Sequence, residues 1–131
     1  MLKKLLFISI LFSMLTFAFA ACGDATSNTS ASNSSGSQVH MDSTTFIQPS
    51  ITIKKGESLT LVSDTVTPHI IANGTWDQGT AKPAKESGAP EVKDVQVNGN
   101  SSTSIGPFNT AGTFKLYCTI HPGMNLTVTV Q

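Results

Sequence analysis

Three residues near the C-terminus offer metal-binding side chains within a short stretch of chain. Cys118, His121 and Met124 follow one another at three-residue intervals and supply a thiolate, an imidazole and a thioether. A soft thiolate combined with imidazole selects copper or zinc. Taken alone, each of these residue types is usually an ordinary core or surface residue. Their close spacing therefore predicts a metal site that none of them would predict singly.

The residues between these ligands favour a loop that folds back on itself. Pro122 fixes its own φ and biases His121 away from the α conformation, whereas Gly123 permits a positive φ. A fourth ligand must come from elsewhere in the chain. His69 is the best candidate, because it follows Pro68 after a polar turn and opens an apolar strand. Two histidines, one cysteine and a weak axial thioether make up a blue-copper site.

These motifs resemble a known family. The segment from Thr113 to Met124, read with Pro68 and His69 upstream, is similar to the plastocyanin and azurin family of cupredoxins. The Cys-x-x-His-x-x-Met loop is most similar to that of amicyanin, a member with a short loop. The likeness spans most of residues 39–131, including Phe46 to Gly56, which resembles the second strand and turn of the family.

The resemblance implies one copper ion that cycles between Cu(II) and Cu(I). By this resemblance, Cys118 Sγ and one ring nitrogen each of His69 and His121 would bind copper in a near-trigonal plane, with the Met124 sulfur at longer distance. Many relatives carry Asn directly after the first histidine, where it helps to fix the cysteine segment; Ile70 occupies that position here. We expect Thr119 or a backbone amide to take over this role.

The resemblance implies a one-electron carrier that is not an enzyme. Its donor and acceptor redox proteins would dock around His121, with Pro68, Pro122 and Gly123 lining the patch, and we expect a monomer. An alternative function is copper binding for delivery or buffering, and a further one is a binding module without metal. Delivery would favour a methionine-rich or histidine-rich surface, which a chain with only Met41 and Met124 after its leader does not offer.

Catalysis would need further copper sites and more histidines, yet only His40 remains beside the two candidate ligands. We expect neither His40 nor Met41 to bind metal. Nucleic acid is not an expected partner, because the chain has no arginine and its eight lysines are balanced by eight acidic residues. Loss of two lysines with a leader would leave a net charge of about −2.

The elements that must position these residues are strands. From Val39 onward, short alternating segments separated by Gly, Pro, Asn and Asp predict an all-β domain over residues 39–131. Seven or eight such strands fit a two-sheet Greek-key β-sandwich with a cupredoxin-like fold. The alternation in Thr113 to Cys118 points Cys118 inward together with Phe114 and Leu116. The inward residues of the last strand would be Leu126, Val128 and Val130.

Other segments are less clear. Alternation around Ile51 to Ile53 and Leu59 to Leu61, with a turn between them, predicts a hairpin. Further strands are expected at Val95 to Val97 and Ser102 to Ile105. Residues 74–91 are expected to form a long surface loop with a turn of helix around residues 84–87. Trp76, within this loop, is expected to serve core or loop packing.

The N-terminal 1–21 segment has the layout of a secretory signal, with two lysines, an apolar run and small residues in order. A transmembrane anchor is the alternative, although the apolar stretch is short and diluted by hydroxyl residues. We therefore expect an exported protein.

Cys22 directly follows Phe19, Ala20 and Ala21, which resembles the lipobox of bacterial lipoproteins, with Phe where Leu is usual. This implies lipidation at Cys22 and a protein anchored on the outer side of the cell membrane. Plain cleavage after Ala20, with release into the periplasm or outside the cell, is the alternative. Residues 22–38 are expected to form a flexible tether. A lipidated Cys22 would leave Cys118 free for metal, whereas the remaining alternative is a disulfide between the two cysteines.

Overall fold

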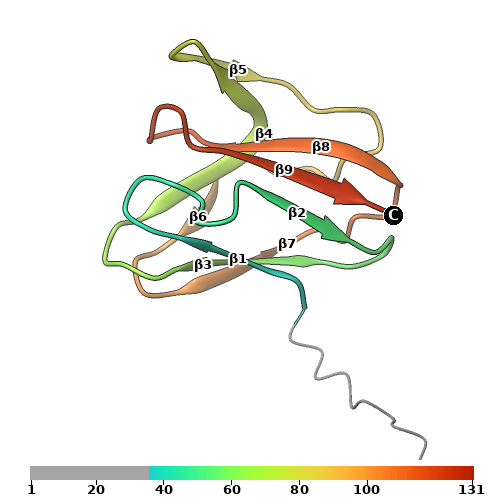
Figure 1. The fold of residues 1–131 in the computed structure, drawn as a ribbon, viewed down its shortest axis with the longest axis horizontal. Coiled ribbons are helices and arrows are strands. Elements are labelled where there is room, and N and C mark those ends of the chain that lie inside the picture. The colour runs from blue at the N-terminus through green and yellow to red at the C-terminus, as the bar shows by residue number, and fades with distance from the viewer. Residues whose placement is uncertain (1–35) are drawn as a thin grey trace, which may run out of the picture. The chain divides into compact units, whose positions relative to one another are not determined.

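The computed structural model describes residues 36–131, which form a β-sandwich of nine strands (Figure 1). The predicted signal at 1–21, Cys22 and most of the predicted tether lie outside the described residues. No helix within residues 36–131 is long and apolar enough to cross a membrane. The strands are β1 (Gln38–Met41), β2 (Ser50–Ile53), β3 (Leu59–Ser63), β4 (His69–Asp77), β5 (Thr80–Pro83), β6 (Val95–Val97), β7 (Ser102–Ile105), β8 (Gly112–Cys118) and β9 (Asn125–Val130).

The strands form two layers, as Figure 1 shows. One sheet has the order β1-β3-β7, and the other runs β2-β9-β8-β4-β5, with β6 also paired to β4. Apolar residues from both sheets meet between the layers, among them Leu59 and Leu61 on β3 and Leu116 on β8, all with no exposed surface. Burial of one such side chain stabilises the fold by about 1.5–3 kcal/mol. The predicted all-β, two-sheet architecture is thus confirmed, with more strands than expected.

The inward residues of β8 and β9 are as predicted. Phe114, Leu116 and Cys118 are buried on β8, and so are the three apolar residues of β9. Tyr117 differs, because alternation places it on the outer face of the sheet and yet it is only 3% exposed. The end of β4 covers it: a Cβ added to Gly74 would lie 2.9 Å from Tyr117 Cε1.

The predicted hairpin between residues 51–53 and 59–61 is wrong. The turn exists, with Gly56 at φ 87° and a Glu57 N–H···O=C Lys54 hydrogen bond of 3.0 Å. However, β2 pairs in parallel with β9, while β3 pairs in parallel with β1 and antiparallel with β7. The turn carries the chain from one sheet to the other, so that Ile53 and Leu59 both bury their side chains in the same core.

The stretch 74–91 is only partly a loop. β4 continues through Asp77 and turns at Gln78 and Gly79, whose φ values of 48° and 77° suit a tight two-residue hairpin turn. β5 then runs back along the end of β4. The turn of helix expected at residues 84–87 is absent from the structure, which has a single turn at Ser87 and Gly88 there. The missed signal was Gln78-Gly79, since Gly at the second position of a tight turn permits the required positive φ.

Candidate metal centre

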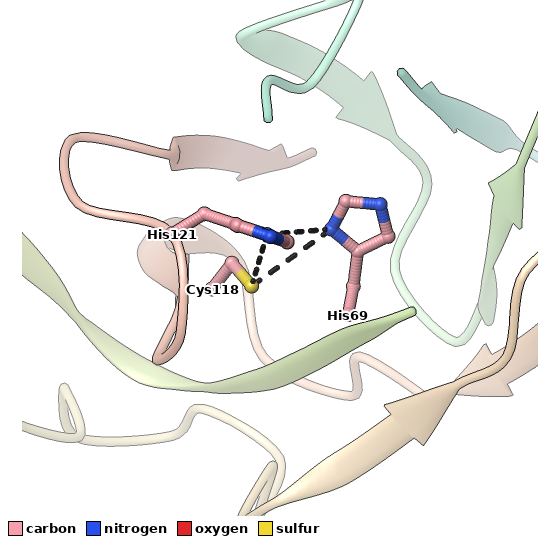
Figure 2. Close-up of side chains that lie close together, drawn as sticks. All are labelled: His69, Cys118 and His121. Atoms are coloured by element: carbon pink, nitrogen blue, oxygen red, sulfur yellow. Dashed lines mark hydrogen bonds between the residues drawn. The ribbon is translucent and has the colours of Figure 1, made fainter. Parts of the chain in front are cut away.

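The sulfur of one cysteine and one nitrogen from each of two histidines point toward one another (Figure 2). Cys118 Sγ lies 3.3 Å from His121 Nδ1 and 3.9 Å from His69 Nδ1, and the two Nδ1 atoms are 3.2 Å apart. The two rings meet at a steep interplanar angle of 65°. Both histidines therefore present the same nitrogen, Nδ1, to the thiol.

Two neighbouring strands bring these residues together. His69 is the first residue of β4 and Cys118 is the last residue of β8, and the two strands pair with Ile71 opposite Cys118. The end of β8 thus lies beside the start of β4, although 49 residues separate the two ligands. His121 and Met124 follow in the loop that joins β8 to β9.

Backbone hydrogen bonds close this loop. The N–H of Cys118 donates to the carbonyl of Met124 at 3.0 Å, and the N–H of Met124 donates to the carbonyl of His121 at 3.2 Å. Gly123 has φ 81°, a conformation that a side chain would disfavour. The loop therefore turns back on itself as predicted, and the Met124 side chain is buried to 2% exposure.

Thr119 connects the two strands that carry the ligands. Its N–H donates to the carbonyl of Ile70 at 2.8 Å, and its Oγ1 donates to the same carbonyl at 3.3 Å. The residue after the first histidine thus contributes through its backbone, which does not require an asparagine side chain. The two expected supports, Thr119 or a backbone amide, both occur here, because the hydroxyl and the amide of Thr119 share this carbonyl.

The two histidines differ in exposure and charge environment. His69 is fully buried, whereas His121 is partly exposed. Burial, and then the nearby His121 ring, lower the pKa of His69, while the backbone and the carboxylate of Asp42 offset part of this decrease. The site therefore favours the neutral imidazole, which is the form that binds a metal ion.

The donor set fits copper. A thiol sulfur and two imidazole nitrogens that face one point stabilise one another little. Together, however, they are the donors that a soft or borderline metal ion prefers. Met124 adds a buried thioether, which zinc sites do not favour and blue-copper sites use as a weak axial ligand. The residues that would hold the ion are thus His69, Cys118, His121 and Met124.

The remaining residues singled out in the sequence lie as follows. Pro68 is exposed directly before His69, and Pro122 and Gly123 are exposed in the loop that carries His121. His40 faces Asp64, with Nδ1 2.9 Å from a carboxylate oxygen, and Met41 is fully buried in the core.

Trp76 has a role that its position in the sequence did not indicate. Its Nε1–H donates a 2.8 Å hydrogen bond to the backbone carbonyl of Cys118. Its backbone is held in turn by the side chain of Asn125, the residue after Met124. Sequence alone could not find this contact, because it joins an indole to a backbone carbonyl and leaves no spacing pattern.

Comparison with known proteins places the fold and the site in a family. Residues 33–131 match the family described as copper binding proteins, plastocyanin/azurin family. The chain is 30% identical to plastocyanin from Ulva prolifera over 88 residues, which are 66% of this chain and 86% of that protein.

Solved structures agree with this placement. Amicyanin from Paracoccus versutus superposes with a TM-score of 0.57 at 26% identity, covering 75% of this chain and 83% of amicyanin. A reduced amicyanin variant superposes with a TM-score of 0.56 at 22% identity, covering 74% and 83%.

The predicted similarity to amicyanin is therefore confirmed in three dimensions. The cofactor is one copper ion, and its ligands are His69, Cys118, His121 and Met124. From its sequence, its fold and this four-residue site, the chain belongs to the plastocyanin/azurin family of copper-binding proteins.

Proposed function

We propose that this protein is a blue-copper one-electron carrier that exchanges electrons with donor and acceptor redox proteins. The observation that carries the proposal is the convergence of Cys118 Sγ with the Nδ1 atoms of His69 and His121, together with the burial of Met124 in the same loop as Cys118 and His121. Copper bound there supplies a Cu(II)/Cu(I) couple whose potential the ligands and their surroundings tune. The family consists of electron carriers and not of enzymes.

Partners dock on the surface around His121. Of the two histidine rings, His121 is the partly exposed one, so its edge offers the shorter route from the metal to a partner. Pro68, Pro122 and Gly123 are exposed on the two adjoining loops, and Ile120 is 46% exposed beside His121. An apolar rim of this kind suits a transient complex, because it excludes water without fixing the partner through many charged pairs.

Absorption spectroscopy and voltammetry of the copper-loaded full chain test the proposal. We expect an intense thiolate-to-Cu(II) charge-transfer band and a reversible one-electron couple. The variant Cys118→Ser is the matched control: it keeps the size of the side chain but replaces the sulfur, and it should lose the band. A wild-type protein without that band or without a reversible couple would contradict the proposal.

Copper delivery is the alternative function. Both methionines among residues 36–131 are buried, Met41 completely and Met124 to 2% exposure, so neither offers a surface sulfur for copper transfer. Mixing the Cu(I) protein with a chelating acceptor separates the two functions: an electron carrier retains its copper over many redox cycles. Rapid transfer of copper to the acceptor would favour delivery.

The carrier is exported and held on the outer side of the cell membrane by lipid on Cys22, and it acts there as a monomer. The sequence pattern before Cys22 supports this, and residues 22–38 would serve as the tether. Mass spectrometry and cell fractionation test the anchor: wild type should carry lipid and sediment with membranes, whereas Cys22→Ala should be released. Wild-type protein that fractionates without lipid would instead favour plain cleavage and a periplasmic or extracellular carrier.

A further inference from the structure

We propose that Trp76 is a positioning residue for Cys118: its indole N–H holds the backbone carbonyl of the cysteine ligand and thereby fixes the base of the metal-binding loop. The inference rests on the copper site of the proposed function, but not on which redox proteins the carrier meets. The Nε1 to carbonyl oxygen distance is 2.8 Å, a normal hydrogen bond.

The Cys118 carbonyl is available because the sheet ladder stops there. In the β8–β9 pair, the N–H of Cys118 donates to the carbonyl of Met124, which would normally be matched by Met124 N–H donating back to Cys118. Met124 instead donates to the carbonyl of His121, as the turn of the loop requires. The carbonyl of Cys118 therefore loses its ladder partner, and the indole of Trp76 replaces it.

The path of β4 brings Trp76 to this point. Gly74 has φ 132° and lies so close to the backbone of Lys82 and Pro83 and to the ring of Tyr117 that no Cβ would fit. Beyond Gly74, β4 leaves β8 and pairs with β5. This change of direction lets the end of β4 lie over the outer face of the sheet, where it covers Tyr117.

Asn125 fixes Trp76 from the other side. Its Oδ1 accepts a 2.7 Å hydrogen bond from the Trp76 N–H, and its Nδ2 donates to the Trp76 carbonyl at 3.0 Å. The indole also packs edge-on against Tyr117, with ring centroids 6.0 Å apart. Trp76 is thus held by the residues on either side of the ligand loop, Tyr117 before Cys118 and Asn125 after Met124.

This arrangement gives Trp76 a direct effect on the site. A fixed carbonyl restricts the backbone of Cys118 and hence the direction of its Sγ, which holds the thiol in place for metal binding. The positive end of the N–H dipole also points toward the cysteine ligand, which disfavours the more highly charged Cu(II). Loss of the N–H should therefore lower the reduction potential.

The test compares Trp76→Phe with the wild-type full chain. Phenylalanine retains an aromatic ring against Tyr117 but removes the donor. In the metal-free protein, we expect hydrogen exchange of the hydrogen-bonded amides of Cys118 and Thr119 to speed up by about fivefold, which corresponds to one neutral hydrogen bond. In the copper-loaded protein, we expect a shifted charge-transfer band and a lower reduction potential. Tyr117→Phe is the matched control, because it keeps the indole donor and should preserve both spectrum and potential.

A folded Trp76→Phe variant with wild-type exchange, spectrum and potential would overturn the inference. If that variant does not fold, exchange of the indole N–H in the metal-free wild type decides: protection supports the hydrogen bond, and exchange at the rate of a free indole overturns it. Asn125→Ala, which removes both side-chain hydrogen bonds to the Trp76 backbone without adding a charge, should give a weaker change in the same direction. Because the exchange data need no copper, a failure of the proposed function would not be mistaken for a failure of this inference.

Discussion

Thr119 donates twice to a single acceptor, the backbone carbonyl of Ile70, through its N–H at 2.8 Å and its hydroxyl at 3.3 Å. This pair of hydrogen bonds joins the residue after the cysteine ligand to the residue after the first histidine. It connects the two halves of the metal site without an asparagine side chain.

The hydroxyl of Thr119 can be tested separately from its amide. We expect Thr119→Val to lower the free energy of unfolding of the metal-free protein by about 0.5–1.5 kcal/mol, the net value of one hydrogen bond, because the Ile70 carbonyl keeps its bond to the amide. Urea unfolding measures the change. Thr113→Val on β8 is the control: Thr113 is exposed and should show a smaller effect. Equal effects of the two substitutions would argue against a role for the hydroxyl.

The thioether of Met124 is expected to set the potential rather than the fold. Met124→Leu nearly conserves volume in a buried position, so it should cost less than about 1.5 kcal/mol of stability. It should raise the reduction potential, because loss of the axial sulfur donor destabilises Cu(II) relative to Cu(I). Met41→Leu is the matched control, since Met41 is equally buried but lies outside the ligand set. Voltammetry of the two variants should separate them, and equal potentials would remove Met124 from the site.

Stability of the metal-free protein should depend on pH through His69. Burial and the neighbouring His121 lower the pKa of His69 in the folded state. In the unfolded chain, this imidazole is protonated below about pH 6.5, whereas in the folded state protonation requires a lower pH. The unfolded state then binds more protons, and the free energy of unfolding falls as the pH falls.

Chemical unfolding at several pH values measures this slope. His69→Gln should reduce the dependence of the free energy of unfolding on pH. His40→Gln leaves His69 in place and should retain the part of that dependence that comes from His69. Bound copper should shift the loss of stability to lower pH, because metal and proton compete for the same nitrogen. A His69→Gln variant with an unchanged slope would show that another group is responsible.

The bend of β4 at Gly74 should tolerate no side chain. In Gly74→Ala, the new Cβ would lie 2.9 Å from both Pro83 Cα and Tyr117 Cε1 and would also meet a backbone oxygen. Gly79→Ala shares the positive φ but has nothing within 4 Å of the added Cβ. We expect the second substitution to cost about 1–2 kcal/mol from backbone strain alone and the first to cost clearly more. Thermal unfolding of both variants checks the order, and similar losses would argue against tight packing at Gly74.

The sequence alone predicted three of the four ligands. The three-residue spacing of Cys118, His121 and Met124 and the inward alternation of β8 are local properties, because the side-chain period of a strand and the conformational limits of Pro122 and Gly123 act over a few residues. These properties predicted the fold class, the turned loop and the copper ligands, with His69 added by resemblance.

Only the tertiary structure decided which strands pair and what surrounds the ligands. The turn after β2 is correctly predicted, yet β2 pairs with β9 and not with β3. The alternation of apolar residues shows which face of a strand is buried, but it is compatible with more than one choice of partner strand. The bonds from Thr119 to Ile70 and from Trp76 to Cys118 end on backbone carbonyls. Every residue carries such a carbonyl, so residue type cannot reveal which one is left free; the path of β4 and the turn of the ligand loop determine it.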